Sequence, residues 1–456
     1  MSIIQLWEVC FILFSQVQFS IQRNDRGSID IGLYAVNSQQ AVDTKYCHIQ
    51  HNLVNDILKQ VRYFLAKNSD VSIYNPAKKV GSLCHLVIRV GFHTNEAMVC
   101  LVSNTKYKDL VANAASKTKG GSGSSSKSGG GSSKGSGSGG SSSSKGSGSG
   151  CGSESEFSFS HLQSFKDSLS SVPGVKCVLY NYNPAPMDAD ILGDEKTEKT
   201  QLLSGESEYI HDTVAGVRVR VSLLSFMQSN PLQAEILYRK VAEVAAFTGN
   251  ETVLDLYCGV GTISLFVAPL VKKVIGVEDC AAAVVDALEN KRINNIENVD
   301  FICGKAEDVL SVTTASGKKT RMDDVVAHDD DDEEKEEEEL FSPDLNPTPV
   351  GGYFPERVTR SSSSKYANIG GVVVVSDDMV AICNPPRKGC EQRLLAALVE
   401  RAVRKIVYVS CNPKTLSRDL DILIRNGYSL DKVCPVDMFP HTTHVEVVCL
   451  LSAPPL

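Results

Sequence analysis

From residue 251 onward the sequence alternates between short apolar runs and amphipathic stretches, and this alternation constrains the fold more than any other feature. Each apolar run has the length of a strand and leads through a turn into a helical pattern. Strands are expected at residues 253–257, 273–278, 299–303, 371–383 and 405–409, and two more within residues 432–452. Strands that alternate with helices form right-handed βαβ units on a parallel sheet. The C-terminal half is therefore predicted to be an α/β domain.

The N-terminal part has a different pattern, in which short strand-like runs surround one amphipathic helix. The helix is expected at residues 48–65, and the strands at residues 29–34, 86–91, 97–102, 175–181 and 209–221. The chain of 456 residues exceeds the length of about 250 residues at which a single core stops growing. We therefore predict a smaller β-rich domain at residues 1–115 and 157–224, and an α/β domain at residues 225–456 that opens with a helix at residues 231–247.

Two segments of unusual composition interrupt these domains. Residues 116–156 consist mostly of Gly and Ser with scattered lysines, which cannot bury enough apolar surface to fold. Residues 313–369 contain an acidic run at 329–339 with ten acids and one lysine. We expect both to be disordered insertions, with an interaction tail as the alternative for the second. Outside the acidic run the chain has 45 basic and 44 acidic residues, so its net charge of −8 gives no indication for or against RNA binding.

The cysteine pattern and the apolar segments bear on cellular location. The 14 cysteines are scattered singly without a Cys-x-x-Cys pair, which argues against a zinc ribbon and against a disulfide framework. Reduced thiols indicate an intracellular protein, with cytoplasm, nucleus and organelle left open. Residues 1–21 are apolar, but Glu8 and several glutamines interrupt them, so we expect no signal peptide. No apolar stretch reaches the about 20 residues of a membrane span, and no membrane association is expected.

A first candidate site lies in the turn after the first strand of the α/β domain, Asp255-Leu-Tyr257-Cys-Gly259-Val-Gly261-Thr262. A Gly pair between a strand and a helix lets a ligand approach the backbone closely. Glu278 ends the next strand, at the place where an acid accepts hydrogen bonds from ribose hydroxyls. A nicotinamide site would need a third glycine, but position 264 is Ser. The shorter form Asp-x-x-x-Gly-x-Gly resembles the site at which class I methyltransferases bind their methyl donor, S-adenosylmethionine. An ordinary tight turn without a ligand is the alternative.

Three further polar residues stand at the ends of apolar runs. Cys411 occurs in Val407-Tyr-Val-Ser-Cys411-Asn-Pro413, Asn384 opens Asn384-Pro-Pro-Arg387, and Glu446 follows His444 in an apolar strand. Asn384 and Cys411 are expected at the carboxyl edge of the sheet, where α/β proteins bind ligands. Each residue also has a plainer interpretation. Asn384 could simply open a proline turn, Cys411 could be a thiol packed in the core, and Glu446 could be a carboxylate that faces water on an edge strand. Inside an apolar strand, however, a carboxylate needs a partner or has a raised pKa, and both suit a general base.

One reaction would use a thiol, a base and a methyl donor together. C5 of uracil is a weak nucleophile, but addition of a thiolate to C6 turns C5 into an enolate carbon that can attack a methyl group on a sulfonium. A base then removes the C5 proton, and elimination frees the thiol. The combination of residues therefore favours a methyltransferase that attacks its substrate covalently.

The motifs together resemble the RNA uracil-5-methyltransferases, which are class I S-adenosylmethionine-dependent enzymes that form 5-methyluridine in tRNA and rRNA. The resemblance covers most of the chain outside the two insertions. It rests on Ser225-Phe-Met-Gln228-Ser-Asn-Pro231, residues 255–262, Asn384-Pro-Pro-Arg-Lys-Gly389, Tyr408-Val-Ser-Cys411-Asn-Pro413 and Asp437-Met-Phe-Pro-His-Thr-Thr-His444-Val-Glu446. It implies a Rossmann-like methyltransferase domain and a structured RNA, tRNA or rRNA, as partner, and we expect a monomer.

The same resemblance assigns roles to residues of this sequence. Cys411 would be the nucleophile and Glu446 the general base. S-adenosylmethionine would be bound by Gln228, Tyr257, Gly259, Thr262, Glu278 and Asn384. No metal is implied, and we expect no iron–sulfur cluster, because only Cys47 resembles one of the four cysteines that hold it in some members.

The sequence departs from the family in two places and leaves two other functions open. Asn384 stands where the family usually has Asp, and residues before 29 leave no room for the OB-like barrel of many members. A catalytically silent RNA-binding or scaffold protein would account for both departures. Cytosine C5 methylation would use the same adduct, although the Pro-Cys and Thr-Cys dipeptides typical of that family are absent.

Overall fold

The computed structural model describes residues 14–35, 38–76, 78–119, 157–185, 191–192, 200–310 and 378–454. Most of the two predicted insertions, including the acidic run, lies outside these ranges, as do residues 371–377 of one expected strand. In the described ranges, no helix combines the length and the apolar character that crossing a membrane requires.

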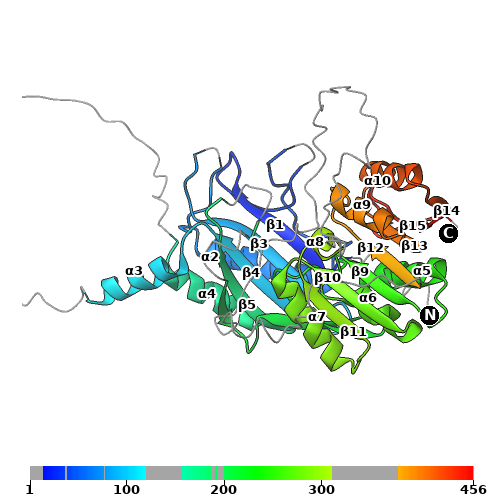
Figure 1. The fold of residues 1–456 in the computed structure, drawn as a ribbon. Helices are drawn as coiled ribbons and strands as arrows, with labels where there is room; N and C mark the ends of the chain where they lie inside the picture. Colours follow the sequence, from blue (N-terminus) through cyan, green and yellow to red (C-terminus); the bar gives the residue numbers. More distant parts are fainter. Residues whose placement is uncertain are drawn as a thin grey trace, which may run out of the picture.

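The N-terminal part is built on a six-stranded sheet with the order β2-β1-β3-β4-β5-β6 (Figure 1). The strands are β1 (Gln16–Arg23), β2 (Ile29–Gly32), β3 (Leu83–Val90), β4 (Ala97–Ser103), β5 (Val175–Tyr182) and β6 (Gln201–Ser204). Neighbouring strands are antiparallel except β4 and β5, which are parallel and lie on opposite sides of residues 120–156 in the sequence. Residues before and after this segment therefore share one sheet.

The helices of this part pack against one another, and two of them contact the sheet. They are α2 (Asn52–Lys67), α3 (Tyr107–Lys119) and α4 (Phe159–Ser170). Apolar residues of α2 recur every three or four positions, as in Ile57, Val61 and Phe64, and all three are buried in a core shared with Phe165 of α4. Burial of this apolar stripe is what places α2 against α4 and the sheet.

Strands β3 and β4 are buried on both faces, because successive side chains of a strand point in opposite directions. On β4, Leu101 packs into the core formed with α2 and α4. Its neighbour Cys100 belongs to a second core with a hairpin, β7 (Tyr209–Val214) and β8 (Val217–Ser222), and with the helix α5 (Pro231–Ala245). That second core continues into the C-terminal sheet through Val253 and Val274.

The C-terminal part is a seven-stranded sheet with the order β11-β10-β9-β12-β13-β15-β14. Its strands are β9 (Thr252–Leu256), β10 (Lys273–Glu278), β11 (Val299–Cys303), β12 (Met379–Cys383), β13 (Lys405–Ser410), β14 (Ser429–Val436) and β15 (Glu446–Ser452). The first five are parallel, as the alternating pattern predicts, and β15 is antiparallel to both β13 and β14. The remaining helices are α6 (Thr262–Val267), the 3-10 helix η1 (Ala268–Leu270), α7 (Ala281–Ile293), α8 (Ala306–Leu310), α9 (Gln392–Glu400) and α10 (Pro413–Arg425).

Candidate active site

A cavity of about 490 Å³ lies at the carboxyl ends of the parallel strands. The chain runs from β9 towards β11 on one side and from β12 towards β13 on the other, so the strand order reverses between β9 and β12. Ligands of open α/β sheets bind at such a reversal. The walls comprise Leu224, Phe226, Gln228, Tyr257, Gly259, Val277, Glu278, Asp279, Cys280, Ala283, residues 304–307, residues 384–388, Glu391, Cys411 and Glu446. All the predicted site residues except Thr262 are in this lining.

The Gly turn after β9 forms one side of the cavity. Tyr257 and Gly259 both have positive φ, at 64° and 56°, which turns the chain sharply before α6. Gly261 also has positive φ, at 81°, and a Cβ there would lie 2.5 Å from the Phe301 ring, so this position must be glycine for the turn to pack on β11. The turn thereby exposes its backbone to the cavity.

Glu278 at the end of β10 joins this turn to the next one. Its Oε2 accepts the Gly259 N–H at 2.9 Å and its Oε1 accepts the Cys280 N–H at 2.9 Å. The residue is buried, and burial raises the pKa of its carboxyl to about 7. A carboxylate has about four acceptor sites, so each oxygen can still accept a hydrogen bond from a ligand hydroxyl.

Thr262 is placed differently from the sequence-based expectation. As the first residue of α6 it is buried, and its hydroxyl lies 2.8 Å from the hydroxyl of Tyr238 on α5. This contact directs the Thr262 side chain to α5 and away from the cavity. Thr262 therefore stabilises the turn through its contact with α5 and does not line the cavity.

Gln228 comes from the segment between β8 and α5, which polar contacts hold in place. Within this segment, Ser225 Oγ donates to Oδ2 of the buried Asp286 on α7 at 2.6 Å. From the N-terminal sheet, the buried guanidinium of Arg89 donates to the Ser222 carbonyl at 3.0 Å and to the Ser225 carbonyl. The N-terminal sheet thus helps to set the wall that carries Gln228.

Cys411 follows β13 directly and precedes α10. The chain turns there because the Ser410 hydroxyl accepts the Asn412 N–H at 3.1 Å, Asn412 caps α10, and Pro413 occupies its first turn. The Cys411 residue is half-buried and lies in the cavity wall. A strand that ends in a tight turn therefore presents the thiol to the pocket.

Glu446 is the first residue of β15, the strand next to β13. The antiparallel register pairs Ser410 with Val447, so continuing it by one residue sets Cys411 opposite Glu446. The Glu446 side chain is 3% exposed, and its Oε2 has no hydrogen-bond partner among the described residues. Burial raises the pKa of this carboxyl to about 7, against the opposing effect of the Arg387 charge. The two residues predicted as nucleophile and base thus face one cavity from adjacent strands.

Asn384 and Arg387 belong to the loop after β12. Asn384 lines the cavity, and its backbone N–H donates to the Leu256 carbonyl of β9 at 3.3 Å. Arg387 also lines the cavity, and its Nη2 lies 3.5 Å from Nδ1 of His444. The loop therefore contributes an amide and a cation to the wall of the cavity.

Several lining residues carried no assignment from the sequence. Phe226 lies two residues before Gln228, Arg387 lies within the Asn384 motif, and residues 304–307 follow β11 at the same sheet edge. The carboxyl-edge rule that pointed to Asn384 and Cys411 applies equally to residues 304–307 and could have found them. Among the residues that the structure describes, no group of three or more His, Cys, Asp or Glu side chains is placed to hold a metal ion.

Comparisons with known proteins match this arrangement. The profile of the tRNA (uracil-5-)-methyltransferase family matches residues 184–331 and 366–453. The chain belongs to this family. An uncharacterized RNA methyltransferase of Enterococcus faecalis is 31% identical over 96% of this chain and 70% of its own length. Another from Halalkalibacterium halodurans is 32% identical over 93% of this chain and 68% of its own length.

A solved structure shows that the fold is shared with a member of this family. The Pyrococcus abyssi tRNA (uracil-54, C5)-methyltransferase in complex with S-adenosyl-L-homocysteine has a TM-score of 0.58, with 21% identity, 96% of this chain and 75% of that chain covered. The predicted Rossmann-like α/β fold and the predicted membership of the RNA uracil-5-methyltransferases are confirmed. The protein is therefore an RNA methyltransferase of the uracil-5 type.

Proposed function

We propose that the protein methylates C5 of uridine in a structured RNA, tRNA or rRNA, through a covalent bond between Cys411 and C6 of the base. The observation that carries this proposal is that Cys411, directly after β13, and Glu446, at the start of the adjacent strand β15, both lie in the wall of one cavity. A thiol and a carboxyl that share a pocket can act in turn on the two neighbouring carbons of one ring.

S-adenosylmethionine fits the side of the cavity formed by the Gly turn. Glu278 keeps acceptor capacity for ribose hydroxyls, and Tyr257 and Gly259 form the adjoining turn. Gln228 and Asn384 lie in the walls of the same cavity as neutral polar residues, while Thr262 acts through the packing of the turn. When bound, the donor supplies the electrophilic methyl group that an activated C5 takes up.

The residues of this chain then perform two operations. The Cys411 thiolate adds to C6, and the electron pair of the C5–C6 bond moves towards O4, which makes C5 nucleophilic. After C5 has gained the methyl group, Glu446 accepts the C5 proton. The electron pair left on C5 restores the double bond to C6 and expels the thiolate, so the enzyme is regenerated and 5-methyluridine is released.

The proposal is tested by incubating the protein with S-adenosylmethionine and a uridine-containing tRNA or rRNA transcript, followed by nucleoside analysis by mass spectrometry. We expect 5-methyluridine at a defined position. Formation of 5-methylcytidine would instead establish cytosine methylation. Absence of donor binding in calorimetry, together with absence of any methylated nucleoside, would favour a silent RNA-binding protein.

The rate of product release is expected to rise with pH through about 7. Glu446 accepts the C5 proton only when ionised, and burial holds the pKa of its carboxyl at about 7. Below that pH the ionised fraction and the release rate should fall about tenfold per pH unit, and above it the rate should level off. Single-turnover release of 5-methyluridine measures this profile. Adduct formation with 5-fluorouridine RNA, which loses no proton from C5, is the internal control, and a flat release profile would contradict the prediction.

We further propose that the β-rich N-terminal part contacts the RNA, along the outer face of α2. Tyr63 is 55% exposed with the Lys67 ammonium 5.0 Å from its ring centre, and Lys59 is exposed one turn earlier. Before α2, the exposed Tyr46 lies with its ring 4.8 Å from that of His48. Exposed aromatic rings next to cations suit stacking with unpaired bases beside phosphates.

The N-terminal end of α2 is connected to the cavity wall through a series of contacts, which include the buried rings of Phe14 and Phe439. His51, the cap of α2, donates its backbone N–H to the Phe14 carbonyl at 3.1 Å. The Phe14 ring stacks on Phe439 at 6.0 Å, and Phe439 lies 6.2 Å from the ring of His444, two residues before Glu446. The start of α2 is therefore joined by packing to the segment that leads into Glu446.

Combined replacement of Tyr63 and Lys67 by alanine is expected to weaken RNA affinity about 5- to 100-fold, since stacking of one base contributes about 1–3 kcal/mol. The affinity for S-adenosylmethionine should not change. Filter binding and calorimetry measure the two constants. Arg239→Ala on α5, which removes an exposed cation paired with Glu235, is the control. Equal RNA affinity of the double variant and this control would refute the assignment of the surface.

A further inference from the structure

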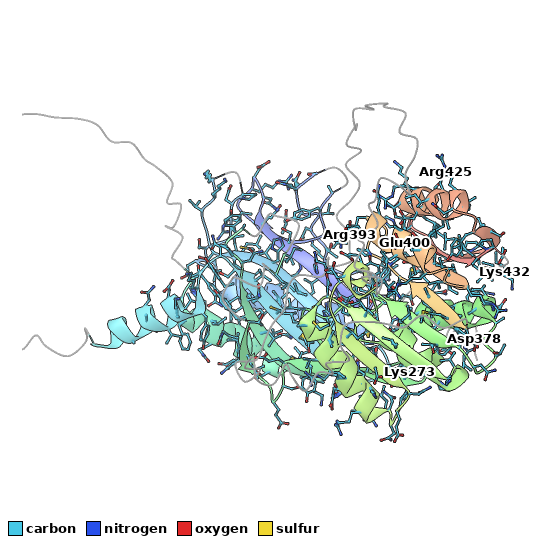
Figure 2. All side chains as sticks on the ribbon, viewed as in Figure 1. Lys273, Asp378, Arg393, Glu400, Arg425 and Lys432 are labelled. Atoms are coloured by element: carbon cyan, nitrogen blue, oxygen red, sulfur yellow. The ribbon has the colours of Figure 1, made fainter. Side chains whose placement is uncertain are left out.

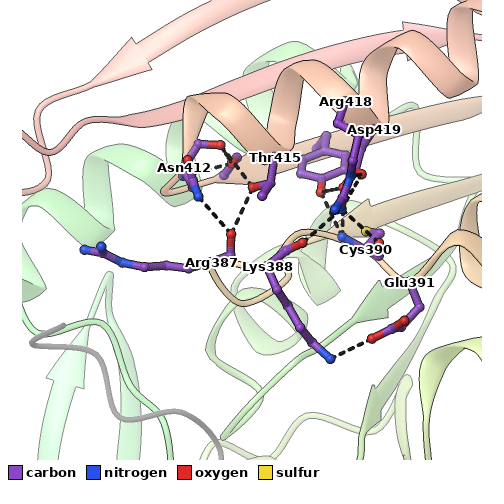
Figure 3. Close-up of polar contacts among 10 residues, drawn as sticks. Arg387, Lys388, Cys390, Glu391, Asn412, Thr415, Arg418 and Asp419 are labelled. Atoms are coloured by element: carbon purple, nitrogen blue, oxygen red, sulfur yellow. Dashed lines mark hydrogen bonds and ion pairs between the residues drawn. The ribbon is translucent and has the colours of Figure 1, made fainter. Parts of the chain in front are cut away.

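The backbone of the loop after β12 is bound by side chains of a single helix face. Two donors of α10 share the Arg387 carbonyl, namely Asn412 Nδ2 and Thr415 Oγ1, each at 3.0 Å (Figure 3). One turn further along α10, Arg418 Nη2 donates to the Lys388 carbonyl at 2.9 Å. These residues recur every three positions and so lie on one side of the helix. The loop and the helix are therefore held together as one rigid unit.

A second set of hydrogen bonds holds the loop near Cys390. The buried Asp419 accepts the Cys390 N–H at 2.8 Å and the Tyr408 hydroxyl at 2.5 Å through Oδ2. Gly389 has a φ of 79°, and a Cβ there would lie 2.6 Å from Asp419 Oδ2. Close approach of loop and helix thus requires glycine at this position. The Asn384 end is anchored independently, through the backbone bond to Leu256 on β9.

Asn412 is the residue that connects this unit to the thiol, because it is the direct neighbour of Cys411 and uses both ends of its amide. Its Oδ1 accepts the Lys414 N–H at 3.1 Å and caps α10, while its Nδ2 binds the Arg387 carbonyl. The position of the residue that carries the thiol is thereby tied to the position of Arg387, which faces Glu446 in the cavity.

We propose that Asn412 is a positioning residue, which sets the Cys411 sulfur against the uracil ring bound in the cavity that Arg387 and Glu446 line. The proposal rests on the proposed role of Cys411 as nucleophile. Loss of the bond between Asn412 and Arg387 lets the thiol turn and the loop move independently. Because a displacement of about 1 Å lowers the rate of a positioned reaction about 100-fold, the step affected is the attack on C6. The donor side of the cavity, which is anchored on β9, keeps its geometry.

The test is the substitution Asn412→Ser, because serine caps a helix as well as asparagine does but is too short to reach the Arg387 carbonyl. We expect covalent adduct formation with 5-fluorouridine RNA to slow about 10- to 100-fold at saturating RNA and donor. The dissociation constant of S-adenosylmethionine and the melting temperature should stay close to those of the wild type. An adduct rate within twofold of the wild type would overturn the proposal.

Asn426→Ser is the matched control at the opposite end of the same helix. Asn426 caps the C-terminus of α10, and its Nδ2 donates to the Ile422 carbonyl at 2.8 Å. Its neighbour Arg425 lies at the outer surface at this far end of α10 (Figure 2). This variant should lower the melting temperature and leave the adduct rate unchanged, whereas a slowed rate in both variants would show that helix stability alone is responsible.

Thr415→Val keeps the cap of α10 and removes the second donor to the Arg387 carbonyl. Alone it should slow the adduct about threefold or less, because Asn412 still holds the carbonyl, and combined with Asn412→Ser the loss should exceed the product of the single effects. If the rate losses of the two single variants simply multiply in the double variant, the two side chains do not act through one shared contact with the Arg387 carbonyl. Failure of the proposed function itself is recognised separately, since the wild type would then form no adduct, or the adduct would survive in Cys411→Ala.

Discussion

Replacement of Cys411 by alanine removes the thiol that we propose bonds to C6, and it should abolish 5-methyluridine formation, with a loss of about 10⁴-fold or more. The same variant should form no covalent complex with 5-fluorouridine RNA. In the wild type this complex accumulates, because fluorine at C5 cannot leave as a proton does and the last elimination is blocked. Denaturing gel electrophoresis of protein with labelled RNA shows the complex directly.

A matched cysteine variant separates chemistry from stability. Cys434 on β14 is half-buried like Cys411 but is not part of the cavity wall. Cys434→Ala should retain both the product and the 5-fluorouridine adduct. An undiminished adduct in Cys411→Ala would remove the covalent mechanism, and loss of the adduct in both variants would indicate a general defect of the fold.

Glu446→Gln should separate attack from release. Glutamine is almost the same size as glutamate but cannot accept a proton, so the thiol can still add to C6 and C5 can still be methylated, whereas the proton stays on C5. We expect turnover to fall about 100- to 10,000-fold, and a methylated covalent complex to accumulate on natural uridine RNA. Mass spectrometry of the complex, with the mass of the added methyl group, is the decisive measurement.

The control for this substitution is Glu243→Gln on α5, an exposed glutamate paired with Lys240. It should turn over at the rate of the wild type. Normal turnover of Glu446→Gln would mean that another group removes the C5 proton. A variant that neither attacks nor binds donor would show instead that the charge of Glu446 is needed to build the cavity.

Much of the C-terminal fold could be predicted because its central strands β9, β12 and β13 are buried on both faces and its helices follow in regular alternation. The expected strand at residues 273–278 coincides with β10, and the carboxyl-edge rule brought Glu278, Asn384 and Cys411 to the correct side of the sheet. That rule can be applied to a sequence alone, because parallel strands all end at the same edge of the sheet and the residue that follows each strand must lie at that edge.

The relation between Cys411 and Glu446 could not be predicted in the same way. It depends on β15 lying beside β13 in a particular antiparallel register, which is set by pairing between strands that are distant in sequence. Thr262 illustrates the opposite difficulty. It stands in the expected motif, but the Tyr238 hydroxyl, 24 residues earlier, draws its side chain into the core.

The strand β1 was missed for a reason that its pairing makes plain. The glutamines that interrupt the apolar run near the N-terminus alternate with Val17, Phe19 and Ile21, which are all buried. A polar residue at every second position is the pattern of a strand between two different environments, not a break in a hydrophobic segment. β1 then occupies an interior place in the sheet, between β2 and β3.

The double burial of β3 and β4 has a consequence for the cooperativity of the whole protein. One core contains Val87 of β3 and Cys100 of β4 together with Val253 and Val274 of the methyltransferase sheet. Removal of the N-terminal sheet would therefore expose apolar surface on the remaining half, as well as releasing the wall that Arg89 holds. We therefore expect the two halves to unfold as one cooperative unit, because excising either half would leave the apolar surface of the shared core exposed.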